Sequence, residues 1–490
     1  MNQILITLSL LLFLGFFPIS AYGQERPEMN YEYGWQMHGA VSSAGEMPFW
    51  MHSNRHGALD RHSGNAALNL TGRWDYEFAS GLTASAGGNV LFRGAEESGV
   101  WLQEGYIQAG YGNFVLWAGR KREDLGLVYR ELSSGTVDLS HNARPVPKIT
   151  FATEGFQSVP GTGNVLWFDA SLSHGWLNDN KYRYIEDPYL HQKHLYLRFF
   201  SDNAPVVPMA GIKHFAHWGG VHPEDGALPD GFLDYRDVFF SLTPDAKEIL
   251  EGGQLPNRYQ NHMGSYDFAL QFNLERYRIS VSRQFILEDT PNARFGTPFD
   301  GLWGAYIERR PATETSWRSE SSGESGAEYR PLLRAALYEY LDTIEGIDRH
   351  DHRDKDSYYN YYNHSAYRGG WAYQNRSLGS PLLFTDEDYM GVVNNLLIAH
   401  HAGFLGHIGA VDWRFFGTYS RNYGASGATT LEGDRSIRVT GRRDQWSFML
   451  ELKTGALSPS LETAATLAYD TGEVYEDNFG VMISLRWTGR

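Results

Sequence analysis

The sequence predicts an all-β protein, a transmembrane antiparallel β-barrel that forms a single domain over residues 24–490. Three observations predict this fold class. The chain begins with one short apolar segment, and beyond it there is no run of about 18 apolar residues that could form a spanning helix. Several later segments alternate apolar and polar side chains, which is typical of strands that cross a bilayer.

The apolar segment at the start predicts export. Residues 4–20, ILITLSLLLFLGFFPIS, are followed by Ala21 and Gly23, small residues before an expected cut that precedes Gln24. This is the pattern of a Sec-type signal peptide over residues 1–23, although its first three residues lack the usual Lys or Arg. An uncleaved membrane anchor is the alternative, for which the run is short. We expect the mature chain in the outer membrane of a Gram-negative bacterium.

Composition excludes several classes of function. With no Cys among 490 residues, the chain cannot form disulfides, thiolate zinc sites, iron–sulfur sites or Cys nucleophiles. A net charge of −16 opposes binding to a polyphosphate backbone, so nucleic acid is not an expected partner. The 30 Tyr, 27 Phe and 14 Trp supply the apolar surface that disordered chains lack. A folded protein is therefore expected.

Period-two alternation predicts the individual strands, because successive side chains of a strand point to opposite faces. In residues 265–274, one face carries Tyr266, Phe268, Leu270, Phe272 and Leu274, while the other carries mainly polar or small side chains. A tight turn at Glu275 and Arg276 then leads into a return strand over residues 278–285. The same alternation predicts strands over residues 166–174, 411–420, 446–453 and 479–487.

A soluble β-sandwich also alternates, so the polar face is needed to choose between the two architectures. Charged side chains stand in the middle of predicted strands, and many apolar faces begin or end in an aromatic residue. Mid-strand charges suit a wet barrel interior, and terminal aromatics suit the two membrane interfaces. The mid-strand charges are Asp169, Arg198, Asp267 and Arg414. A barrel is favoured, although the last strand ends its aromatic pattern at Trp487, three residues before the C-terminus.

Connections differ in length and thereby predict an orientation. Residues 110–113 and 405–407 are predicted as tight turns, which suit the periplasmic end of a barrel. Four long stretches, 121–148, 216–236, 288–330 and 343–380, are predicted as extracellular loops that carry function. Residues 245–252, DAKEILEG, show a helical pattern that Thr243 and Pro244 would open.

Several strings in this order resemble the capsule-assembly Wzi family, from about residue 31 to the C-terminus. They are PFWMHSNRHGALDR (48–61), GRK (119–121), NVLWFDASLSHGWL (164–177), LHQKHLYLRF (190–199), GIKHFAHWGG (211–220), NHMGSYDF (261–268) and NYYNHSAYRGGWAYQNRSLGSPLL (360–383). The resemblance implies an outer-membrane barrel of about 18 strands with minor periplasmic helical structure. It also implies a lectin-like, non-catalytic protein that attaches or organises capsular or other surface polysaccharide. It assigns no binding residue to a position of this chain.

Catalytic and metal-binding alternatives have weaker support. The chain has 18 His, including His214 with His217, His350 with His352, and His400, His401 and His407. These sets show no fixed ligand spacing, so no metal site is expected. A hydrolase with a Ser, His and acid triad is a further alternative by analogy with barrels that are outer-membrane hydrolases, although the chain has no Gly-x-Ser-x-Gly elbow. We expect no enzymatic activity and no cofactor; the alternative function is an outer-membrane porin or glycan-passing channel, which an open lumen would distinguish.

An aromatic and amide cluster over residues 355–376 is the candidate polysaccharide site. Flat rings beside amide and guanidinium donors suit a sugar, which has a C–H face to stack and hydroxyls to hydrogen-bond. The alternative is a packed loop with an aromatic girdle. The expected partners are capsular polysaccharide or exopolysaccharide and outer-membrane lipid, and a monomer is expected. The candidate residues are Trp218, Tyr361, Tyr362, His364, Trp371, Tyr373 and Arg376.

Overall fold

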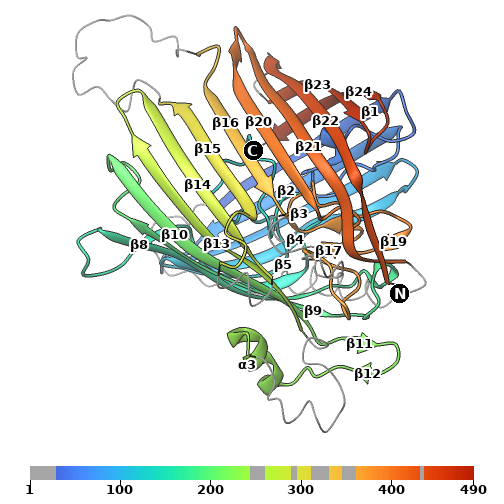
Figure 1. Cartoon of the computed structure of the whole chain (residues 1–490). Coiled ribbons are helices and arrows are strands. Elements are labelled where there is room, and N and C mark those ends of the chain that lie inside the picture. The colour runs from blue at the N-terminus through green and yellow to red at the C-terminus, as the bar shows by residue number, and fades with distance from the viewer. Residues whose placement is uncertain are drawn as a thin grey trace, which may run out of the picture.

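A computed structural model describes residues 29–242, 260–288, 295–310, 330–344, 360–430, 435–458 and 460–489. Within these residues the chain forms a closed antiparallel β-barrel of 18 strands (Figure 1), which confirms the predicted fold class. The expected signal peptide (1–23) and helical segment (245–252) lie outside the described residues.

Each barrel strand pairs with its neighbour along the chain, and β1 pairs with β24 to close the ring. Trp35 of β1 lies opposite Trp487 of β24 in this closure. The strands are β1 (Met29–Ser42), β2 (Asn65–Glu77), β3 (Leu82–Gly94), β4 (Gly99–Tyr111), β5 (Phe114–Arg120), β6 (Lys148–Thr153), β8 (Leu166–Trp176), β9 (Tyr189–Phe199), β10 (Val206–Trp218), β13 (Gln260–Asn273), β14 (Tyr277–Leu287), β15 (Gly301–Arg309), β16 (Ala335–Asp342), β20 (Leu397–Ile408), β21 (Val411–Thr430), β22 (Arg435–Ser458), β23 (Leu461–Gly472) and β24 (Asn478–Gly489).

Short elements complete the described structure. Two-residue strands extend the barrel sheet at β7 (Gln157–Ser158) and β19 (Tyr389–Met390). Small hairpins form from β11 (Val221–His222) with β12 (Gly226–Ala227), and from β17 (Ala372–Tyr373) with β18 (Arg376–Ser377). The helices are α2 (Phe49–His52), α3 (Phe232–Phe240) and the 3₁₀ turn η1 (Asn180–Tyr182).

No described helix has both the length and the apolar character needed to cross a membrane.

The two ends of the barrel differ in their connections. At the end where β1 begins and β24 finishes, most connections are tight turns, such as residues 112–113 and 274–276. At the opposite end the connections include residues 43–64, 121–147 and 343–396, and we call it the long-loop end. Helical structure is minor, as predicted, but both described α-helices belong to connections at the long-loop end and not to the end with tight turns, where periplasmic helices were expected.

Most strand predictions are confirmed, but one loop and one turn are wrong. The extracellular loop predicted over residues 288–330 contains the barrel strand β15, which runs back to the end where β1 begins. The hairpin of β13 and β14 forms around residues 274–276, with Asn273 opposite Arg278. The turn predicted at residues 405–407 lies inside β20, and the chain turns at Gly409 and Ala410 instead. Gly409 has a φ of 60°, a conformation that glycine adopts without steric cost.

Alternation separates an apolar outer face from a polar inner face. On β13, Phe268 points outward with 44 % of its surface exposed, whereas its neighbour Asp267 points inward and is 0 % exposed. An outer face that is apolar and exposed is the pattern of strands that cross a bilayer.

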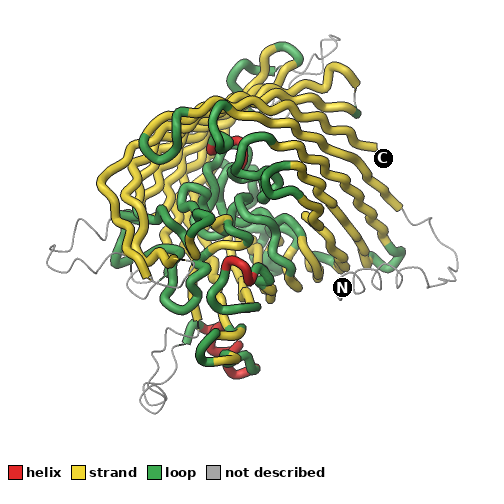
Figure 2. The backbone as a smooth tube through the Cα atoms, turned by 90° about the vertical axis from the view of Figure 1, so that its right-hand side faces the viewer, coloured by secondary structure: helices red, strands yellow, loops and turns green. Residues whose placement is uncertain are grey.

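The interior of the barrel contains connecting segments (Figure 2). Three segments occupy it: residues 49–59, 121–147 and 360–396, which we call the plug. Asp138 of the plug lies 2.6 Å from Nζ of Lys213 on β10, which is also 3.3 Å from Asp267 on β13. Asp267, one of the mid-strand charges that suggested a wet interior, therefore helps to anchor the plug.

A second polar contact fastens the plug to β16, three strands further round the barrel from β13. The carboxylate of Glu339 on β16 accepts hydrogen bonds from the hydroxyls of Ser133 and Ser134, at 2.7 and 2.6 Å, and from the backbone N–H of Ser134 at 2.8 Å. All three side chains are buried. Buried polar groups with several such partners hold a single arrangement, because breaking one leaves an unsatisfied group.

Candidate functional site

A polar pocket of about 490 Å³ opens at the long-loop end, where five connections meet. The connections are residues 43–64, 95–98, 121–147, 177–188 and 343–396, and the ends of β3 and β4 complete the wall. We call this the rim pocket. Its lining residues are Gly57, Asp60, Arg61, Arg93, Glu96, Glu97, Ser98, Trp101, Arg144, Asp179, Tyr182, Gln374, Asn375, Arg376 and Glu387.

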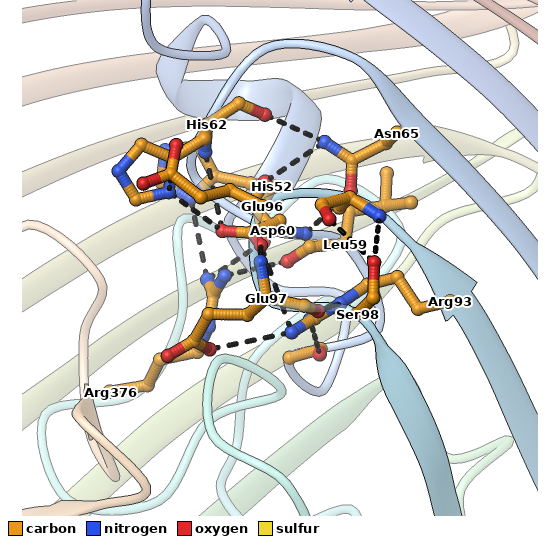
Figure 3. Close-up of polar contacts among 12 residues, drawn as sticks. His52, Leu59, Asp60, His62, Asn65, Arg93, Glu96, Glu97, Ser98 and Arg376 are labelled. Atoms are coloured by element: carbon orange, nitrogen blue, oxygen red, sulfur yellow. Dashed lines mark hydrogen bonds and ion pairs between the residues drawn. The ribbon is translucent and has the colours of Figure 1, made fainter.

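Asp60 is the centre of the hydrogen-bond network in one wall of the rim pocket (Figure 3). Its carboxylate accepts the backbone N–H of Glu97 at 2.8 Å and lies 3.8 Å from a guanidinium nitrogen of Arg93. The Nδ1 atom of His62 is 3.1 Å from the other carboxylate oxygen. The backbone N–H of Asp60 donates to the amide oxygen of Asn65 at 2.8 Å. The network thus joins the β1–β2 and β3–β4 connections.

The same contacts set the charges of Asp60 and His62. Burial alone would raise the pKa of Asp60, but the N–H of Glu97 and the charge of Arg93 hold it below its ordinary value. Burial opposes protonation of His62, yet its hydrogen bond to Asp60 and the charge of Glu387 raise its pKa above the ordinary value. Asp60 therefore stays ionised, and His62 takes a proton more readily than a free histidine.

Arg376 fixes the floor of the rim pocket. One of its nitrogens donates to the backbone carbonyl of Leu59 at 2.6 Å, and another donates to that of His52 at 3.2 Å. Burial and the positive charges of Arg61 and Arg93 lower the pKa of Arg376 to about 9. A buried guanidinium surrounded by other guanidinium groups favours negatively charged or strongly polar groups nearby.

Two half-buried rings stand among these charged groups. The guanidinium carbons of Arg93 and Arg144 lie 4.5 and 5.0 Å from the ring centroid of Trp101. Burial and neighbouring arginines, Arg120 first among them, lower the pKa of Arg144 to about 10. The ring of Tyr182 lines the same pocket. Rings, guanidinium donors and carboxylate acceptors together can hold a hydroxyl-rich ligand through its C–H faces and its hydroxyls.

Of the seven residues that the sequence singled out, Arg376 lines the rim pocket, and four others lie inside the plug. Trp371 donates from its indole nitrogen to the carbonyl of Asp138 at 2.6 Å, and Tyr373 donates to the amide oxygen of Asn178 at 2.8 Å. Because their rings are covered on both faces, they cannot stack on a sugar in this conformation. Tyr361, Tyr362, Trp371 and Tyr373 are 1 %, 0 %, 1 % and 0 % exposed.

The remaining two predicted residues lie apart from the rim pocket. Trp218, at the end of β10, is buried against Tyr235 of α3. His364 is half-buried, and its Nδ1 atom accepts the backbone N–H groups of Ala366 and Tyr367, each at 3.2 Å. The structure therefore brings Arg376 to the pocket, whereas the other six side chains do not line it.

Most of the pocket's charged residues escaped the sequence analysis. Asp60 stands in the string at residues 48–61 that carries the resemblance, but the resemblance assigns it no binding role. Glu96 and Glu97 suggest only solvated surface charge, and Arg93 and Arg144 belong to no motif. Their only sequence signal is a group of charges beside glycines, as in RGAEE at residues 93–97. Such a group is common in any loop, so the sequence could not distinguish a pocket from a solvated turn.

The histidine sets have other roles where the structure describes them. Nδ1 of His401 is 2.7 Å from the hydroxyl oxygen of Thr418, and its Nε2 is 2.8 Å from the carbonyl of Leu132. Within the described part of the chain, no group of three or more His, Asp or Glu is placed to hold a metal ion. His350 and His352 lie outside the described residues.

No protein-family model and no curated protein matches this sequence. Among solved structures, the chain is similar to Wzi of Escherichia coli, described as an outer-membrane protein involved in group 1 capsule assembly and as a carbohydrate-binding β-barrel. The two share 15 % sequence identity with a TM-score of 0.58, over 92 % of this chain and 83 % of Wzi.

Two other solved structures match at lower TM-scores. OccK5 (OpdH) of Pseudomonas aeruginosa is 9 % identical over 94 % of this chain and 98 % of its own, with a TM-score of 0.45. OmpT of Vibrio cholerae, in the form that lacks loop L8, is 8 % identical over 95 % and 100 %, with a TM-score of 0.35. The similarity to Wzi confirms the resemblance seen in the sequence at the level of fold: this chain is a β-barrel of the outer-membrane type, built like the Wzi barrel.

Proposed function

We propose that this protein is a non-catalytic outer-membrane barrel that holds surface polysaccharide at its rim pocket. The observation that carries the proposal is the pocket itself, in which guanidinium groups, carboxylates and two aromatic rings from separate connections converge. Its volume of about 490 Å³ has room for a short stretch of a glycan chain. The long-loop end would face the outside of the cell.

The filled interior favours attachment over transport. A porin or glycan-passing channel, the alternative function, needs a continuous wet path between the two ends of the barrel. Here the plug is anchored by buried polar contacts on β10, β13 and β16. A barrel closed in this way can present a binding surface outward while keeping the membrane sealed.

The fold similarity adds support of a different kind. Wzi is described as a carbohydrate-binding barrel, and this chain has the same architecture at 15 % identity. Within the pocket we assign the donor role to Arg376 and its neighbours Gln374 and Asn375, and the stacking role to Tyr182.

The test removes pocket side chains that lie on its surface. The double variant Tyr182→Ala and Gln374→Ala should lower polysaccharide retention on cells, measured as cell-bound against shed polysaccharide. Tyr111→Ala is the matched control, because Tyr111 is 68 % exposed at the opposite end of the barrel. Heat-modifiable gel migration must show that all variants form the barrel. Retention that equals wild type in the double variant contradicts the proposal.

A separate measurement addresses the channel alternative. The wild-type protein should give no large, steady conductance steps in planar bilayers, because the plug fills the lumen. Large steady steps would favour the porin function instead.

A further inference from the structure

Helix α3 lies on the outer face of the barrel wall, not in the lumen (Figure 1). Its position follows from the alternation of β10, on which Ile212 is outward-facing and 42 % exposed. Ala216 and Trp218 share the parity of Ile212 and therefore also point outward, yet both are buried. What covers them is α3, because Val238 of the helix is packed in the same buried cluster.

The helix also contacts the outer face of the neighbouring strand, β9. His191 pairs with Ala216 across the sheet and shares the parity of Leu195, which is 43 % exposed. The ring of His191 lies 5.5 Å from that of Tyr235 and 5.6 Å from that of Phe239. One side of α3 therefore packs against outward-facing side chains near the long-loop ends of β9 and β10.

Two polar contacts fasten the C-terminal end of α3 to this wall. Nζ of Lys193, an outward-facing residue of β9, donates to the carbonyl of Phe239 and lies 3.9 Å from the centroid of that ring. The side chain of Ser241 lies 3.0 Å from Nε2 of His214 on β10. A lysine is well placed beside the last carbonyls of a helix, where the helix dipole is negative.

The other side of α3, together with Leu242 just beyond its C-terminal end, carries large apolar side chains that no described residue covers. Four occur within eleven residues: Phe232, Leu233, Phe240 and Leu242 are 82 %, 62 %, 63 % and 46 % exposed. A water-soluble surface rarely gathers such side chains, because apolar surface is less stable in contact with water than when buried. The helix also carries polar residues, namely Asp234 and the ion pair of Arg236 with Asp237.

We propose that α3 is an interfacial helix whose exposed apolar side chains insert into the lipid leaflet at the long-loop end. Its seat is continuous with the lipid-facing band of the barrel, in which Ile212, Leu195 and Leu172 are exposed on adjacent strands. Tryptophan and tyrosine around the seat, at Trp176 and Tyr189, are typical of the boundary between acyl chains and headgroups. The helix thus extends the membrane contact of the barrel beyond its strands.

Because the native chain has no Cys, single-cysteine labelling can test this placement. We would introduce Leu233→Cys and Phe240→Cys separately, attach a nitroxide, and reconstitute the protein in phosphatidylcholine–phosphatidylglycerol vesicles. Accessibility to oxygen and to a water-soluble nickel chelate reports the surroundings of each label. Ile212→Cys is the lipid reference, and Glu224→Cys is the water reference, since Glu224 is an exposed residue of the same connection.

Labels at residues 233 and 240 should show an oxygen-to-nickel ratio severalfold above that at residue 224 and close to that at residue 212. A ratio equal to that at residue 224 would overturn the proposal, because the helix face would then contact water. Low accessibility to both reagents would overturn it as well, since a protein partner would then cover the face. Heat-modifiable migration of each labelled protein confirms that the barrel has formed.

Discussion

Two charged clusters of this barrel are built from similar residues and differ in what surrounds them. In the lumen, Lys213 stands between Asp138 and Asp267, and all three side chains are 0 % exposed. At the rim, Asp60 contacts Arg93 and His62, but the cluster continues outward to Glu96, whose side chain is 69 % exposed. The first cluster is closed by protein, whereas the second borders a cavity.

The difference indicates which cluster is structural and which can bind a ligand. In the lumen, Tyr196 and Gln284 donate to Asp267 at 2.7 and 3.0 Å, and Ser265 donates to Asp138 at 2.8 Å. Protein groups thus surround both carboxylates, and the cluster holds the plug. At the rim, the outer members of the cluster face open volume, where a ligand can complete their hydrogen bonds.

The largest effect is expected in the lumen, from Lys213→Met. The variant leaves two buried carboxylates without their cation, which should lower the free energy of unfolding by roughly 3–5 kcal/mol. The urea midpoint, followed by heat-modifiable gel migration, measures the loss. A triple variant with Asp138→Asn, Lys213→Met and Asp267→Asn is the control, and it should recover much of the stability because no buried charge remains. A single variant as stable as wild type would contradict the structural role of the cluster.

An intermediate effect is expected at the rim, from Asp60→Asn. The loss of a charged acceptor for the N–H of Glu97 should cost about 1.5–3 kcal/mol. The change should also lower the pKa of His62 toward its ordinary value, because the hydrogen bond from His62 to Asp60 raises it. Nuclear magnetic resonance titration of labelled histidines, with His62→Gln for assignment, measures the shift. An unchanged His62 pKa would show that the two groups do not interact.

The pH dependence of this contact follows from the two shifts. The raised pKa of His62 gives a stabilisation that is fully present below pH 6.5, the ordinary pKa of histidine. It is lost as the pH rises through the pKa of His62 in the folded protein. The lowered pKa of Asp60 gives a stabilisation that is fully present above pH 3.8, the ordinary pKa of aspartate. It is lost as the pH falls through the pKa of Asp60 in the folded protein. The Asp60–His62 contact should therefore be strongest in mildly acidic solution, and the same titration would reveal it.

The smallest effect on stability is expected at the outer edge of the rim pocket, from Glu96→Gln. Its carboxylate lies 3.9 Å from His62, and solvent screens an ion pair of this kind. Unfolding in urea should change by no more than about 0.5 kcal/mol. Polysaccharide retention should nevertheless fall, because Glu96 lines the pocket. A stability loss as large as that of Lys213→Met would remove the distinction between the two clusters.

The barrel could be predicted from the sequence because its signal is local. Alternation of the kind seen around Phe268 and Asp267 follows directly from the geometry of a strand and needs no distant partner. The return strand after Arg276 was predictable for the same reason, since a hairpin joins neighbouring segments. The turn predicted at residues 405–407 failed because two glycines lie close together, and only the φ angles show which of them turns the chain.

The rim pocket could not be predicted from the sequence, because its lining residues come from connections that are far apart in the chain. Trp371 reaches the carbonyl of Asp138, which is 233 residues away, so an aromatic and amide cluster that suggested a sugar surface proved to fill the lumen. The start of helix α3 falls in the loop predicted over residues 216–236. A helix of only nine residues depends on its packing against the barrel wall, which the local sequence does not reveal. The sequence by itself determined the strands and their two faces, since each residue's face depends only on its place in the alternation. The tertiary structure alone decided which loops fill the lumen and which charges border a pocket, because that depends on packing between segments hundreds of residues apart.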